Sequence, residues 1–172
     1  MNSELIKTYK YYYYNEINKY DYRYTTAFPL ITKYKNVTGH YIERPLTPKE
    51  SKDFLHKQFF SYIKKKILVP DRHNKNRRGT PFYAYYVISK QEGDIHYHAH
   101  VLFNVHEHYA KYVISYIELF TGGKVIKLET KEDTKRMIWY MLRRGNLVTD
   151  SDDEYLLPTG YNLGVDKRHF GF

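Results

Sequence analysis

The order of strand-like and helix-like segments is the feature that most constrains the fold of this chain. Strand formers fill residues 24–34, 81–90, 95–104 and 124–129, and apolar residues recur at helical spacing in 48–68, 107–120 and 131–144. The segments therefore run β-α-β-β-α-β-α, with the two central strands adjacent. This order predicts an α+β fold with a central antiparallel sheet of about five strands, split-βαβ or ferredoxin-like, with helices packed on one face.

Local end signals set several of these boundaries. The segment Thr47–Glu50 is a capping-box pattern with proline at the first helical position. Thr130, with Asp133 at the third position, is expected to cap the helix over 131–144. Gly93 predicts a tight turn that joins the two central strands into a hairpin.

The length of 172 residues predicts one domain over 1–172, with its core at about 24–145 and unassigned extensions on both sides. Cysteine is absent, which excludes disulfides and thiolate metal sites and fits a cytoplasmic setting. There is no run of about 18 apolar residues, and the polar N-terminal segment lacks the apolar core of a signal peptide. No membrane association is expected.

The charge balance points to a polyanionic partner. The formal net charge is +9, and aromatic residues make up 18% of the chain, including 21 tyrosines. Basic side chains interleaved with aromatic rings suit single-stranded nucleic acid, although an AT-rich coding sequence would also enrich tyrosine. The loop over 70–79 is expected to contact a nucleic-acid backbone or to be simply solvated. Its basic residues are Arg72, Lys75, Arg77 and Arg78.

Three histidines alternate within the third predicted strand. Because alternate side chains of a strand point to one face, His96, His98 and His100 are expected to project together. Neighbouring imidazoles at this spacing, about 6–7 Å at the backbone, can hold one divalent ion. The third ligand is open between His100, Gln91 and Glu92. A zinc site made of the three histidines is the competing interpretation.

A second constellation lies on the last predicted helix. Arg143 and Arg144 follow Tyr140 by three and four residues, and therefore share its helix face. A phenol ionises only near pH 10, so an adjacent guanidinium would favour the phenolate and could also pair with a phosphate. Tyrosine beside arginine is also a common packing arrangement, so this spacing alone is not diagnostic.

Taken together, the two constellations resemble a known enzyme family. The segment 93–99 (GDIHYHA) resembles the His-hydrophobe-His motif of HUH endonucleases, the rolling-circle replication initiators. The segment 140–145 (YMLRRG) resembles their later Tyr-x-x-Lys-x-Gly motif, and the two motifs occur in the family order. The resemblance covers roughly residues 24–145.

The resemblance implies a Rep-type nuclease with His96 and His98 as ligands of Mn²⁺ or Mg²⁺. It implies that Tyr140 attacks single-stranded DNA, or a DNA hairpin, at the replication origin of a plasmid or virus. The product would be a 5′-phosphotyrosine with a free 3′-hydroxyl, which the reverse reaction reseals. A single tyrosine would be compatible with a homodimer that carries out two-step reactions, and the enzyme would act in the host cytoplasm.

The chain departs from the family pattern at several positions. Arg143 replaces the lysine, Ile95 replaces the proline before the first histidine, and no carboxylate ligand is evident on the partner strand, where Gln91 is the candidate. The segment 98–100 (HAH) offers a second register for the histidine motif. No Walker motif occurs, so no helicase module is expected.

Other functions remain compatible with the sequence. A single-tyrosine transposase or a relaxase would use the same chemistry on another DNA substrate. A non-catalytic nucleic-acid-binding module would explain the charge and the aromatic residues, but it would not need Tyr140 or the histidines. A zinc hydrolase would use His96, His98 and His100 and would not need Tyr140.

Overall fold

The computed structural model describes residues 3–68, 82–90, 93–144 and 159–163. Its centre is an antiparallel sheet of five strands in the order β6-β1-β5-β4-β7. The strands are β1 (Tyr24–Pro29), β4 (Phe82–Ser89), β5 (His98–Val105), β6 (Val125–Lys127) and β7 (Thr159–Leu163). The expected α+β class and five-stranded antiparallel sheet are confirmed.

Four of these strands have the split-βαβ arrangement that the sequence predicts. The chain runs from β1 through a helical segment to β4, returns directly along β5, and crosses again through a helix to β6. Taken in chain order, the four strands lie 4-1-3-2 across the sheet, which is the ferredoxin-like order. As a result β5, which carries two of the histidines, is the middle strand and pairs on both sides.

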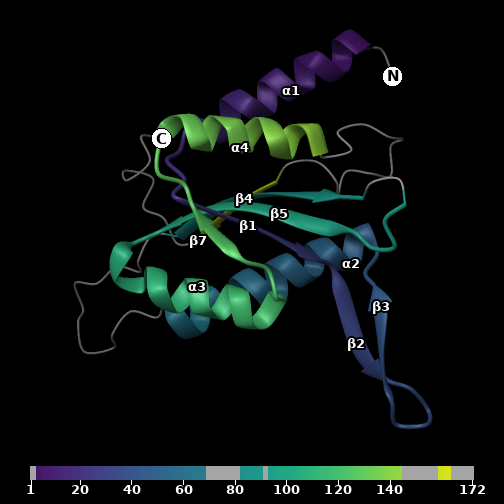
Figure 1. Cartoon of the computed structure of the whole chain (residues 1–172). Coiled ribbons are helices and arrows are strands. Elements are labelled where there is room, and N and C mark those ends of the chain that lie inside the picture. Colours follow the sequence, from purple (N-terminus) through teal and green to yellow (C-terminus); the bar gives the residue numbers. More distant parts are fainter. Residues whose placement is uncertain (1–2, 69–81, 91–92, 145–158, 164–172) are drawn as a thin grey trace.

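One face of the sheet is covered by two helical segments (Figure 1). The first begins as α2 (Pro48–Asp53) and continues as two π-helical stretches, Phe54–Phe60 and Ile63–Ile67, and the second is α3 (Glu107–Thr121). The predicted extents, 48–68 and 107–120, are confirmed, and the capping box at Thr47 and Glu50 is formed. Aromatic side chains dominate this layer, which we call the α2/α3 core. Its members include Phe28, Phe59, Phe60, Phe82 and Phe103.

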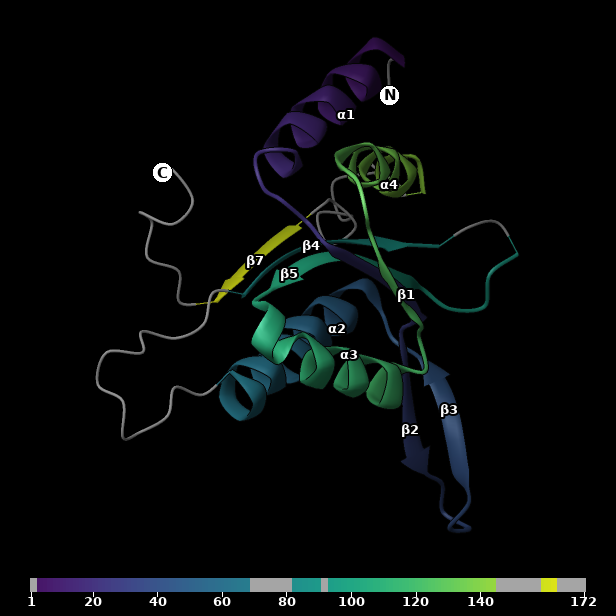
Figure 2. The ribbon, with the colours of Figure 1, turned by 60° about the vertical axis from the view of Figure 1, so that its left-hand side comes forward.

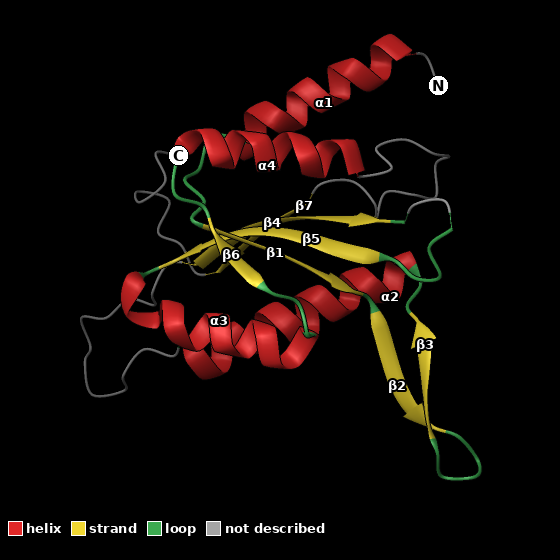
Figure 3. Ribbon diagram, in the orientation of Figure 1, coloured by secondary structure: helices red, strands yellow, loops and turns green. Residues whose placement is uncertain are grey.

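The opposite face is covered as well, by α1 (Ser3–Ile17) and α4 (Lys131–Arg144) (Figure 3). The expectation of helices on one face only was therefore wrong. The reason lies in β5, where adjacent residues Leu102 and Phe103 are both fully buried, so the sheet is apolar on both faces and each needs a cover. The second layer, which we call the α1/α4 core, is smaller. Its buried members are Ile17, Tyr22, Val87, Leu102, Ile138, Met141 and Leu142.

A two-stranded ribbon projects away from the sheet (Figure 2). It consists of β2 (Ile31–Lys35) and β3 (Tyr41–Pro45), which pair only with each other. The sequence predicted one strand over 24–34, but that segment is split at Leu30. Pro29, which has no amide hydrogen, ends the first half, and the chain then turns into the ribbon.

In the part of the chain that the structure describes, no helix is both long enough and apolar enough to cross a bilayer.

Candidate functional site

Strand β5 directs His98 and His100 toward the α1/α4 side of the sheet. Side chains alternate along the strand, and Leu102, two residues beyond His100, belongs to the α1/α4 core. His100 also pairs directly with Val87 of β4, another member of that core. Both imidazoles are partly buried. The expected common face is therefore confirmed for these two histidines.

His96 differs from the other two because it lies in a bend before β5. The ladder with β4 ends where Ser89 pairs with His98, and the ladder with β1 ends where Pro29 pairs with the same residue. The predicted strand over 95–104 therefore begins later, at His98. The predicted tight turn is also wrong, because the connection between the paired residues Ser89 and His98 is longer than a tight turn. Nevertheless, the ring centroids of His96 and His98 are only 4.8 Å apart. The two rings are therefore close because the chain bends at His96, and not because the two residues alternate along one strand.

Asp94 gives His98 a fixed neighbour. Its Oδ2 lies 3.7 Å from the Nδ1 of His98. Burial is the main cause that lowers the pKa of His98, the nearby His96 lowers it further, and Asp94 opposes both. A lowered pKa keeps the imidazole neutral at pH 7, which is the form that coordinates metals. A carboxylate beside Nδ1 leaves Nε2 available as the ligand atom, as in many metal sites.

Tyr140 approaches the histidines from α4. This helix spans the predicted residues, and Thr130 and Asp133 form the expected capping hydrogen bonds at its start. The ring centroid of Tyr140 lies 5.7 Å from that of His100, at an interplanar angle of 75°. The guanidinium carbon of Arg143 lies 6.0 Å from the Tyr140 centroid. Arg144 ends the helix, and its side chain lies outside the described part of the structure.

The metal-ligand set is only partly described. His96, His98 and His100 lie within the described residues, whereas Gln91 and Glu92 lie outside them. Among the described residues, no three histidine or carboxylate side chains form a group that could hold a metal ion. A divalent ion held by the adjacent His96 and His98 rings would therefore need at least one further ligand from elsewhere. His100, by contrast, packs against the tyrosine.

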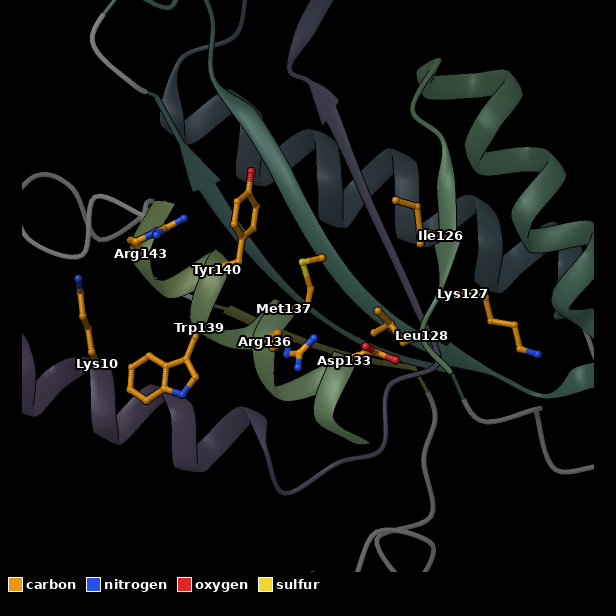
Figure 4. Close-up of a pocket in the computed structure, with 10 residues that line it drawn as sticks. All are labelled: Lys10, Ile126, Lys127, Leu128, Asp133, Arg136, Met137, Trp139, Tyr140 and Arg143. Carbon is orange, nitrogen blue, oxygen red and sulfur yellow. The ribbon is translucent and has the colours of Figure 1, made fainter. Parts of the chain in front are cut away.

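A groove runs along α4 and includes Tyr140 (Figure 4). Its volume is about 940 Å³. Its walls come from α1, from α4 and from β6 with the residue that follows it. The lining residues are Lys10, Ile126, Lys127, Leu128, Asp133, Arg136, Met137, Trp139, Tyr140 and Arg143.

The sequence did not single out Lys10, Arg136 or Trp139 as site residues. The signal for Arg136 was present, because it precedes Tyr140 by four residues and therefore shares a helix face with it and with Arg143. Lys10 comes from a helix that the sequence pattern did not predict. The predicted backbone contacts Arg72, Lys75, Arg77 and Arg78 lie outside the described residues.

No family model matches this chain, and neither a curated protein nor a solved structure matches it.

Proposed function

We propose that this protein is a metal-dependent endonuclease that nicks single-stranded DNA through Tyr140 and rejoins the ends. The observation that carries the proposal is the approach of Tyr140 to His100, with ring centroids 5.7 Å apart although the residues lie on different elements. His100 lies two residues from His98 on β5, so this contact supports a nucleophile close to a proposed metal ligand, as phosphoryl transfer at a metal ion needs. The resemblance of both sequence motifs to HUH endonucleases supports the same chemistry.

The reaction needs few groups from the chain. The phenol oxygen of Tyr140 attacks phosphorus, and the bond to the 3′ oxygen breaks. The proton lost by the phenol balances the proton gained by the new 3′-hydroxyl, so the product is a 5′-phosphotyrosine. Arg143, exposed beside the ring, is placed to pair with a phosphate oxygen. Because the phosphotyrosine preserves the energy of the cut bond, the reverse attack reseals the strand.

His96 and His98 are the residues that would hold a divalent ion, Mn²⁺ or Mg²⁺. Such an ion supplies Lewis-acid polarisation of the scissile phosphate. Asp94 lies near His98, at 3.7 Å from its Nδ1, and the neutral state of that imidazole at pH 7 keeps a ring-nitrogen lone pair available. The biological role that fits this chemistry is the initiation of rolling-circle replication.

The proposal is tested by trapping the covalent product. The protein is mixed with labelled single-stranded oligonucleotides and Mn²⁺, and the mixture is run on a denaturing gel. We expect a metal-dependent shifted band that Tyr140→Phe abolishes and that His98→Ala weakens by about a hundredfold or more.

The matched control is Tyr112→Phe, an exposed tyrosine on α3 across the sheet, which should behave as wild type. Binding without any adduct would favour a non-catalytic nucleic-acid-binding module instead. Cleavage that survives Tyr140→Phe would show that Tyr140 is not the nucleophile, and the absence of any adduct in that variant would point to water.

A further inference from the structure

The groove along α4 is strongly cationic for its size. Lys10, Lys127, Arg136 and Arg143 line it, against the single carboxylate of Asp133. That carboxylate is already engaged, because it accepts hydrogen bonds from the backbone and the hydroxyl of Thr130. The groove therefore presents an excess of positive charge, the complement of a phosphate backbone.

Two of these cations are exposed and form no direct ion pair among the described residues, although the Asp133 carboxylate attracts Arg136 electrostatically. Arg136 and Arg143 are exposed on α4, and neither forms a salt bridge with any residue that the structure describes. Lys127 differs, because its Nζ lies 3.5 Å from Glu129. The guanidinium groups are consequently available to an external anion, and they lie on the same helix face as Tyr140.

Aromatic side chains accompany the cations where α1 meets α4. Trp139 is directed from α4 toward α1 (Figure 4), where it stacks on Tyr14 with ring centroids 4.7 Å apart and meets the edge of Tyr11 at 5.6 Å. Trp139 is 37% exposed and Tyr11 60% exposed. Rings that are stacked on one side and open on another are suited to stack against unpaired bases.

We propose that this groove binds single-stranded polynucleotide, with α1 as one of its walls. Phosphates lie on Lys10, Arg136 and Arg143, and bases pack against Trp139. The proposal deepens the proposed function by giving the strand a path past the nucleophile, but it rests on the groove and not on cleavage. A duplex fits less well, since its bases are stacked on one another and cannot reach the aromatic rings.

Trp139 is the only tryptophan in the chain, so its fluorescence reports on this groove alone. The full-length protein is titrated, without metal, with an oligo-dT of roughly 12 nucleotides. Excitation at the red edge of the band avoids the tyrosines. We expect saturable quenching of Trp139, and the same affinity from the anisotropy of a labelled oligonucleotide. A comparison of oligo-dU with oligo-rU of the same length shows whether the sugar matters.

Substitutions identify the contacts. Lys10→Ala and Arg136→Ala should each weaken binding by about tenfold and lower the salt dependence of log K by about 0.7 per charge removed. Lys111→Ala, which removes one exposed charge from α3 on the far face, should leave both unchanged.

The outcomes separate the two proposals. Quenching that depends on Lys10 and Arg136 supports the groove even if no adduct ever forms, in which case only the cleavage proposal fails. Covalent adducts without any change in Trp139 fluorescence would overturn the groove. Tighter binding of a duplex, or quenching by an acidic peptide with equal affinity, would also overturn it.

Discussion

At the scale of single residues, the proposed site depends on which two histidines would hold a metal ion. His98 is common to both registers, with His96 beside it in the bend and His100 two residues further along β5. His100 packs against the ring of Tyr140, so it can orient the nucleophile without coordinating the ion. If His96 and His98 are the ligands, alanine substitutions at these two positions should weaken metal binding more than an alanine substitution at His100.

We expect His98→Ala and His96→Ala each to weaken Mn²⁺ binding by at least about a hundredfold, because losing a ligand should cost no less than losing its second-shell partner. Isothermal titration calorimetry of the variants measures this directly. His108→Ala, an exposed histidine on α3, is the control. A larger loss for His100→Ala than for His96→Ala would move the ligand pair to His98 and His100.

At the scale of elements, α4 presents Tyr140 and its start is fixed by one capping box. The Thr130 hydroxyl accepts from the Asp133 amide at 3.1 Å, and the Asp133 carboxylate accepts from the Thr130 amide at 3.0 Å. The Thr130 hydroxyl also donates to the Asp133 carboxylate at 2.8 Å, and this bond is the main cause that lowers the pKa of Asp133, followed by the bond from the Thr130 amide. The start of the helix is therefore sensitive to both residues and to acid pH.

Thr130→Ala should lower the free energy of unfolding by about 1 kcal/mol, the usual cost of losing such a cap. Because the pKa of Asp133 is lower in the folded state, its contribution is full at neutral pH. It is lost as the pH falls below about 4, where the unfolded carboxyl protonates. Asp133→Asn should remove that part of the acid dependence. Urea unfolding curves at several pH values measure both effects. If the stability of Asp133→Asn fell at acid pH as much as that of the wild type, the role given to the Asp133 carboxylate would be contradicted.

The elements also show what the sequence could reveal. The helices starting at Pro48, Glu107 and Lys131 carry local signals, caps and apolar periodicity, and were predicted within a residue or two. The ribbon strand β3 is exposed along its whole length, so it has no apolar alternation to detect. Strand β7 exists through its pairing with β4, which is a tertiary contact. Helix α1 packs with tyrosines as well as with the buried Ile17, and its run of tyrosines resembles a low-complexity tract.

In the candidate site too, the sequence could reveal the local features but not the tertiary contacts. Strand alternation placed His98 and His100 on one face, and helix spacing placed Arg143 beside Tyr140, because both are local properties. The meeting of His100 with Tyr140 depends on which face of the sheet α4 covers. Local spacing contains no information about that choice, since β5 is apolar toward both faces.

At the scale of the whole molecule, one sheet supports two cores. Leu102 belongs to the α1/α4 core and Phe103 to the α2/α3 core, and both are fully buried on the middle strand. Because adjacent residues of one strand hold the two layers, the layers should unfold together.

We expect Leu102→Ala to cost about 2–5 kcal/mol of stability and Phe103→Ala about 3–5 kcal/mol, through the cavities they leave. Each variant should unfold in a single transition, with Trp139 fluorescence and far-UV circular dichroism coinciding along the urea axis. An earlier, separate fluorescence transition in Leu102→Ala would mean that the α1/α4 layer unfolds independently.

The central claim is that Tyr140 becomes covalently bonded to DNA, and mass spectrometry of the adduct tests it most directly. Cleavage after Arg136 and Arg143 releases the peptide 137–143 (MIWYMLR), whose only tyrosine is Tyr140. The protein is reacted with single-stranded DNA and Mn²⁺, then digested with nuclease and trypsin. Our account predicts this peptide with a nucleotide attached through a 5′-phosphate to Tyr140. The account would be contradicted by a nucleotide on any other of the 21 tyrosines, or by cut DNA without any modified 137–143 peptide.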